Sequence, residues 1–182
     1  LRQRPRPERT SRYLAVNLAR LLVHDYDAGE LAQTELLLAE ALEGIDGFAV
    51  EATPSRTNLL RTIATLEPGQ HCLVLVDLAA NERDHVFRGL RIIETIALHP
   101  TLSRQARAAA ITVYGYPPML DQVASAGGVA VVHKRALEVP GLDLAPYLTD
   151  ALKTNVPADG QERPLLHVPP QSNLAASRDP AT

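Results

Sequence analysis

The sequence predicts a three-layer α/β domain in which helices cover both faces of a parallel five-stranded sheet. Five short apolar runs alternate with five stretches of helical spacing, an order that requires crossover connections between parallel strands. One run, His71–Asp77, lacks the in-out alternation of a half-exposed strand, which is typical of a central strand buried on both faces. Because open α/β sheets place ligand crevices at the carboxyl ends of their strands, Asp77 is a candidate site residue.

Length and composition indicate one ordinary domain with tails, since the chain has 182 residues of which 46% are hydrophobic. We expect a basic disordered leader over residues 1–12, the domain over 13–153 and a disordered, proline-rich tail over 154–182. No run reaches the roughly 20 apolar residues of a membrane span. The single cysteine, Cys72, cannot form an internal disulfide, so we expect a soluble protein of the reducing cytoplasm.

The net charge of −3 conceals an asymmetry at the start of the chain. Five arginines against one glutamate give residues 1–12 a local charge of +4 and leave −7 for the rest. A nucleic acid or an acidic partner could use these arginines, but a solvated disordered leader, interrupted by two prolines, is the preferred interpretation. No helix-turn-helix region follows the domain, so direct binding to nucleic acid is not expected.

The first half of the chain is expected to hold three strands and two helices. Asp27 and Glu30 resemble a capping box at the start of the first helix, which we expect to end at Gly44. Ser55, with the residues just before it, opens the second helix. The strands lie within 18–24, 48–52 and 71–77.

The second half is expected to hold two strands and three helices. Proline in the first turn marks two of the helices, and paired glycines at 127 and 128 end one of them. The expected helices cover about 86–98, 119–125 and 145–153, and the expected strands cover 108–113 and 129–133.

Polar residues lie at or just after the carboxyl ends of four of these strands. Because parallel strands all point one way, the residues after them collect along one edge of the sheet. That edge receives Asp25, Asp27, Asp77, Thr112 and Lys134. Clustered carboxylates with a hydroxyl and an ammonium indicate a site for a hard divalent cation and a phosphoryl group.

These residues resemble the receiver domain of bacterial response regulators, the phosphate-accepting module of two-component signalling. The resemblance covers about residues 18–152 and rests on Asp25 after an apolar strand, on Leu73–Asp77, on Ile111–Thr112 and on Val131–Lys134. It implies a (βα)5 flavodoxin-like/receiver fold with a parallel sheet in the order 2-1-3-4-5. The 35 positions from Asp77 to Thr112 are somewhat long for the family, with the excess expected around 81–84 or 99–107.

The resemblance also implies roles for the edge residues. Asp77 would be the phosphoacceptor, and Asp25 would bind Mg2+ together with Asp77, with Asp27 as a further candidate ligand. Lys134 would pair with the phosphoryl group or with Asp77, and Thr112 would donate a hydrogen bond to that group and pull the following loop inward. Such a protein is a switch and not a turnover enzyme. Its partners would be a histidine kinase or phosphotransfer protein, a downstream protein and, by analogy, a second copy bound through the last helix.

Four positions depart from the family pattern: Tyr26 replaces an acidic residue, Val113 a small one, Val131 an aromatic one and Arg135 a proline. A phenol is a poor Mg2+ ligand at neutral pH. The departures leave open a pseudo-receiver that switches through a partner or small ligand without phosphate. A flavodoxin-like cofactor-binding or enzymatic domain is also open, although it ought to have a phosphate-binding loop after the first strand, and residues 25–29 are not one.

Overall fold

The computed structural model describes residues 19–43, 45, 47–78, 80–81, 86–114, 117–139, 141–154 and 165–169. Its main sheet has six strands in the order β2-β1-β3-β6-β7-β8, and every neighbouring pair is parallel. The strands are β1 (Ala19–His24), β2 (Phe48–Thr53), β3 (Cys72–Asp77), β6 (Ala106–Thr112), β7 (Ala130–His133) and β8 (Leu166–Val168). The expected order 2-1-3-4-5 is confirmed by the first five positions of this sheet.

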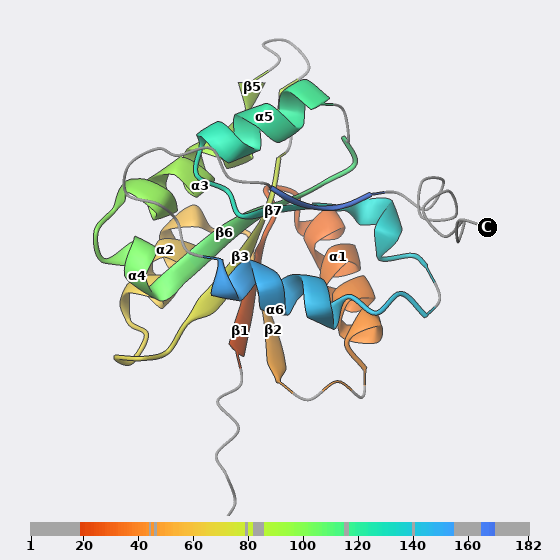
Figure 1. Cartoon of the computed structure of the whole chain (residues 1–182), viewed down its shortest axis with the longest axis horizontal. Helices are drawn as coiled ribbons and strands as arrows, with labels where there is room; N and C mark the ends of the chain where they lie inside the picture. The colour runs from red at the N-terminus through yellow and green to blue at the C-terminus, as the bar shows by residue number, and fades with distance from the viewer. Residues whose placement is uncertain are drawn as a thin grey trace, which may run out of the picture.

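Helices cover both faces of the sheet (Figure 1). One face carries α1 (Ala28–Ala41) and α6 (Ala145–Lys153). The other carries α2 (Arg56–Ala64), α3 (Arg88–Leu98), α4 (Leu102–Gln105) and α5 (Pro117–Ser125). None of the helices in the described part of the chain has the length and apolar character needed to cross a bilayer.

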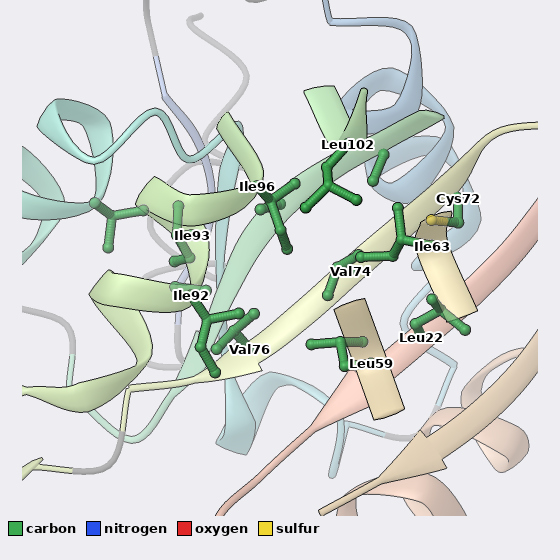
Figure 2. Close-up of a cluster of buried hydrophobic side chains, with 14 of the residues drawn as sticks. Leu22, Leu59, Ile63, Cys72, Val74, Val76, Ile92, Ile93, Ile96 and Leu102 are labelled. Atoms are coloured by element: carbon green, nitrogen blue, oxygen red, sulfur yellow. The ribbon is translucent and has the colours of Figure 1, made fainter. Parts of the chain in front are cut away.

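The central strand β3 is buried along its whole length, as the absence of alternation in its sequence predicts. Its residues point to the two faces in turn. Leu73 and Leu75 pack in the cluster beneath α1 and α6, whereas Val74 and Val76 pack in the cluster beneath the other helices. Figure 2 shows the second cluster, in which α2 and α3 place leucine and isoleucine side chains over β1 and β3. Each such buried side chain contributes about 1.5–3 kcal/mol, so β3 is a firm support for the carboxylate at its end.

The chain between β3 and β6 differs from the expected single helix. Val86–Phe87 forms the short strand β5, which pairs antiparallel with β4 (Ala80–Asn81), so α3 starts at Arg88. The additional helix α4 precedes β6. Extra structure thus lies in both places where the sequence is long for the family. The expected strand over 108–113 runs instead from Ala106 to Thr112.

The sixth strand corrects the expectation of a disordered tail in one segment. Leu166–Val168 lies within 154–182, yet it forms β8 and pairs with β7 at the edge of the sheet. The expected leader over 1–12 and the remainder of the tail after Pro169 lie outside the described residues.

Gly89 in the first turn of α3 allows this helix to approach the end of β3. A Cβ atom at Gly89 would lie 2.2 Å from the backbone carbonyl oxygen of Asp77, which is well inside van der Waals contact. Only a residue without a side chain fits there. The close approach fixes the start of α3 against the strand that carries the candidate phosphoacceptor.

Candidate functional site

The carboxyl ends of four strands meet at one edge of the sheet. The register pairs His24 with Val76 and Thr112 with His133, so the residues that follow these strands emerge at the same level. Asp25 comes directly after β1, Asp77 ends β3 and Lys134 comes directly after β7. Parallel pairing therefore brings together residues that are more than 50 positions apart in the sequence.

Lys134 lies between the two buried aspartates. Its Nζ atom is 3.0 Å from Asp25 Oδ2 and 3.1 Å from Asp77 Oδ1. The side chains of Asp25 and Asp77 are only 4% and 11% exposed, and that of Lys134 is 13% exposed. One ammonium thus offsets two nearly buried carboxylates. Sequence reasoning expected these three residues at the edge, and the structure brings them into direct contact.

Two opposing effects act on the pKa of Lys134. Burial disfavours the charged amine and lowers the pKa, whereas the carboxylates of Asp77 and Asp25 favour it, and their effect is larger, so the pKa lies above its ordinary value. Lys134 is therefore a fixed positive charge at neutral pH. A phosphoryl group on Asp77 would lie within reach of that charge.

Glu30 is a third carboxylate near the ammonium. Its Oε2 atom lies 3.5 Å from Lys134 Nζ, from a side chain that is 58% exposed. Sequence reasoning treated Glu30 only as the partner of Asp27 in a capping box. The position of Glu30 in the first turn of the helix after Asp25 could have indicated that its side chain lies near the carboxylate cluster.

Asp27 serves the backbone and not the carboxylate cluster. As the N-cap of α1, its Oδ1 atom accepts hydrogen bonds from the backbone N–H groups of Gly29 and Glu30, at 2.8 and 3.0 Å. Its own N–H donates to Oδ1 of Asp25 at 2.9 Å, which helps to orient that carboxylate. The predicted N-cap at Asp27 is confirmed. The second half of the expected capping box is not, because the Asp27 N–H donates to Asp25 and the Glu30 carboxylate lies beside Lys134. The amides that a cofactor phosphate would use at this helix terminus are thus bound by the chain itself, which does not favour a flavodoxin-like cofactor site.

The carboxylates at this edge that could hold Mg2+ are those of Asp25 and Asp77. In the described part of the chain, no group of three or more His, Cys, Asp and Glu side chains is arranged to hold a metal ion. Two carboxylates still fit Mg2+, which commonly takes one or two carboxylates and fills its other positions with water and phosphoryl oxygens. Tyr26 supplies no carboxylate, and its ring packs edge-on against His24 with 4.9 Å between centroids. Any cation here must share these carboxylates with Lys134.

Thr112 lies at the end of β6 and is 1% exposed. Its Oγ1 atom accepts a hydrogen bond from the backbone N–H of Tyr114 at 3.0 Å, which closes a tight turn after the strand. Val113 within this turn is 54% exposed, whereas the ring of Tyr114 packs edge-on against Phe87, with centroids 5.6 Å apart. The hydroxyl of Thr112 thus anchors the loop beside the carboxylate cluster.

Two histidines at strand ends, His24 and His133, are buried. His24 Nδ1 lies 2.8 Å from the backbone carbonyl oxygen of Thr53, to which it donates a hydrogen bond. Its Nε2 atom is buried and finds no hydrogen-bond partner among the described residues. His133 Nδ1 accepts a hydrogen bond from the backbone N–H of Arg135 at 3.3 Å. The loss of hydration on burial lowers the pKa of His133.

The comparisons with solved structures identify the fold. A response regulator from Thermotoga maritima superposes with a TM-score of 0.56 at 19% identity, over 75% of this chain and 99% of that one. The fold is that of a response regulator receiver domain. The chemotaxis response regulator CheY4 of Vibrio cholerae gives a TM-score of 0.52 at 14% identity, over 74% of this chain and 99% of that one. The non-phosphorylated receiver domain of the stress response regulator RcsB from Escherichia coli gives a TM-score of 0.53 at 18% identity, over 72% of this chain and 91% of that one.

No protein-family model matches the chain, and no curated protein matches it. At these identities the likeness concerns the receiver fold alone. The chemistry of the site must therefore be argued from its own residues.

Proposed function

We propose that this chain is an atypical receiver protein of two-component signalling that accepts a phosphoryl group on Asp77. The observation that carries the proposal is the contact of Lys134 with both Asp77 and Asp25 at the carboxyl edge of a receiver-type sheet. That constellation supplies a carboxylate nucleophile, a second carboxylate and a fixed positive charge within one small region. The protein acts by changing its contacts with partners and not by turnover.

The transfer converts the Asp77 carboxylate into an acyl phosphate. A carboxylate oxygen attacks phosphorus, a new O–P bond forms, and the bond between phosphorus and the donor's leaving group breaks with its electron pair. Lys134 binds the non-bridging phosphoryl oxygens. Asp25 and Asp77 would hold Mg2+, which would neutralise part of the developing negative charge when bound. The donor in the cell would be a histidine kinase or a phosphotransfer protein, and the setting would be the cytoplasm.

Thr112 provides the link from phosphorylation to the surface. Its buried hydroxyl has a proton to donate to the phosphoryl group, and its oxygen already holds the backbone of Tyr114. A shift of Thr112 towards the site therefore moves the loop that carries Val113 and Tyr114, both of which are exposed to partners. We expect a downstream protein, or a second copy of the chain, to recognise this change.

The test is the intact mass of the full chain after incubation with an acyl phosphate, with and without Mg2+. One Mg2+-dependent phosphoryl adduct is expected on the wild type and on the matched control Asp121→Asn, whose side chain is exposed on α5. The adduct should be absent from Asp77→Asn. An adduct that persists in Asp77→Asn would refute the assignment.

A pseudo-receiver that switches without phosphate is the second candidate. The observation in its favour is that Lys134 offsets both buried aspartates by direct contact, while Tyr26 stands where the family has an acidic residue. Folded wild-type protein that forms no adduct and shows no stabilisation by Mg2+ would support this candidate over the first.

A further inference from the structure

The ammonium of Lys134 has three N–H donors and contacts three carboxylates. Asp25 Oδ2 and Asp77 Oδ1 lie 3.0 and 3.1 Å from its Nζ atom, and Glu30 Oε2 lies 3.5 Å from it. The two aspartates are nearly buried, whereas the side chain of Glu30 is 58% exposed. Glu30 is therefore the outer partner of Lys134 and, in the described position, the most distant of the three.

The backbone of Glu30 is tied to the carboxylate of Asp25 by two successive hydrogen bonds. The N–H of Glu30 donates to Asp27 Oδ1 at 3.0 Å, and the N–H of Asp27 donates to Asp25 Oδ1 at 2.9 Å. The first turn of α1 thus keeps an exposed carboxylate beside the buried ones. A change of rotamer is enough for the carboxylate of Glu30 to follow the ammonium of Lys134.

Lys134 contacts the carboxylate oxygens that a cation at this edge would use. Asp25 Oδ1 accepts the N–H of Asp27, and Asp25 Oδ2 faces the ammonium. Two cations at the same carboxylate repel each other, and the repulsion is strong where little water is present to screen it. A divalent cation bound to Asp25 and Asp77 would therefore drive the ammonium outward.

Glu30 is suited to receive the displaced ammonium. Of the three carboxylates that contact Lys134, it is the one whose side chain is more than half exposed. Three carboxylates at −1 each and one ammonium leave a net charge of −2 for the four groups, which one divalent cation balances. With Glu30 as its partner, Lys134 leaves the aspartates without becoming an unpaired charge.

We propose that Glu30 is a positioning residue that takes over Lys134 from the two aspartates when a divalent cation binds them. Before the cation binds, Lys134 offsets Asp25 and Asp77. Afterwards it pairs with Glu30 at the entrance of the site, where the ammonium can meet an incoming phosphoryl group. The role of Glu30 rests on the Mg2+ site of the proposed function and identifies the residue that lets Lys134 make way for the cation.

Mg2+ titrations of the full chain, followed by NMR of the backbone amides, measure the effect of Glu30 on binding. Glu30→Gln keeps the size of the side chain and removes its charge, so the displaced ammonium loses its partner. We expect the affinity for Mg2+ to fall about two- to fivefold, the range of a partly exposed ion pair. Glu35→Gln, which is also exposed on α1, is the matched control and should bind Mg2+ like the wild type. An affinity that is unchanged or higher in Glu30→Gln would overturn the proposal.

A double-variant cycle separates pairing with Lys134 from simple attraction of Mg2+ by the charge of Glu30. In the Lys134→Met background no ammonium needs a new partner, so Glu30→Gln should weaken Mg2+ binding far less than it does in the presence of Lys134. An equal fall in affinity in the two backgrounds would mean that Glu30 acts by its charge alone and would overturn the proposal.

The position of Lys134 can be followed directly because the chain has only two lysines. Lysine labelled with 13C at Cε gives one signal for Lys134 and one for Lys153, which Lys153→Met assigns. On saturation with Mg2+, nuclear Overhauser effects from the Lys134 ε protons to the Glu30 γ protons should strengthen, and those to the Asp77 β protons should weaken. Unaltered effects in the Mg2+-saturated protein would overturn the proposal. These signals decide it from the wild type alone if a variant does not fold.

The intact-mass test separates failure of this exchange from failure of the proposed function. If the wild type forms the Mg2+-dependent adduct and Glu30→Gln binds Mg2+ normally, the proposed function stands and the role of Glu30 is overturned. If no adduct forms, phosphorylation fails, and the Mg2+ titrations still decide the role of Glu30. Wild-type protein that binds no Mg2+ would overturn that role outright.

Discussion

Replacing Lys134 with methionine removes the charge that two buried aspartates share. Loss of one partner from a buried ion pair costs about 3–5 kcal/mol because the remaining charge is left uncompensated. Lys134 and Asp77 retain 13% and 11% exposure of their side chains, so water reaches part of the site, and we expect a loss of about 3 kcal/mol. A domain of ordinary stability, about 5–15 kcal/mol, survives this change in folded form.

Urea unfolding followed by far-UV circular dichroism measures this loss, since the chain has no tryptophan for fluorescence. With a slope of about 2 kcal/mol per molar urea, the midpoint should fall by about 1.5 M. Lys153→Met is the matched control, because Lys153 is the only other lysine and is exposed at the end of α6. Its midpoint should stay within about 0.3 M of the wild type, as expected for a surface change of up to about 0.5 kcal/mol.

Magnesium should partly restore the Lys134→Met variant, because the cation can occupy the position between Asp25 and Asp77. At ten times its dissociation constant, Mg2+ would add about 1.4 kcal/mol. The wild type should gain less, since Lys134 competes for the same carboxylates. Equal losses of unfolding free energy in Lys134→Met and Lys153→Met would refute the claim that Lys134 offsets the charges of Asp25 and Asp77. If Mg2+ stabilises Lys134→Met no more than the wild type, the claim that Lys134 competes with Mg2+ for these carboxylates is refuted.

Four further predictions concern stability and reactivity. Gly89→Ala should cost about 2–3 kcal/mol of unfolding free energy in urea, because its Cβ would collide with the carbonyl at the end of β3; an unchanged midpoint would contradict the close approach. Asp27→Ala should cost about 1 kcal/mol by the same assay, since two N–H groups of α1 lose their acceptor; a neutral change would contradict the cap. Cys72 is fully buried, and burial raises the pKa of its thiol to about 12. Iodoacetamide at pH 8 should therefore modify Cys72 only after unfolding, which mass spectrometry would measure. Rapid labelling of the folded protein would contradict this prediction. The raised pKa of Lys134 stabilises the fold fully at pH values below the unfolded lysine pKa of about 10.4, and this stabilisation should be lost as the pH rises through the pKa of Lys134 in the folded protein. The urea midpoints of the wild type and Lys134→Met should therefore converge above the folded pKa. A difference between the midpoints that stays constant with pH would contradict this prediction.

The sequence contains strong local signals for five of the six strands of the main sheet, β1, β2, β3, β6 and β7, and for the site. The run that becomes β3 has no polar position before Asp77, and a parallel sheet then determines which other residues join that carboxylate at the edge. Lys134 was a further signal, because lysine occurs only twice in a chain that otherwise uses arginine. The strands follow from periodicity within short windows, and their parallel order along the chain then brings the edge residues together.

The elements that sequence reasoning missed are those held by tertiary pairing. The strands β4 and β5 have two residues each, β8 has three and α4 has four, which is too short for any periodicity to register. β8 also lies in a proline-rich stretch that is compositionally typical of disorder. Hydrogen bonds to β7 hold this segment as a strand, and its own sequence contains no pattern that predicts this pairing.

The geometry at Lys134 explains why the departures from the receiver pattern need not abolish phosphorylation. A site with fewer carboxylates has less negative charge for Mg2+ to offset, and one ammonium already balances part of it. We therefore expect Tyr26, in place of an acidic residue, to weaken metal binding and not to leave an unbalanced charge. A phosphodonor that brings its own negative charge would bind both the ammonium and the cation, so Mg2+ affinity should rise when the phosphoryl group is present. Measuring Mg2+ affinity with and without a phosphoryl mimic such as beryllofluoride would show this coupling, and equal affinities in the two states would refute it.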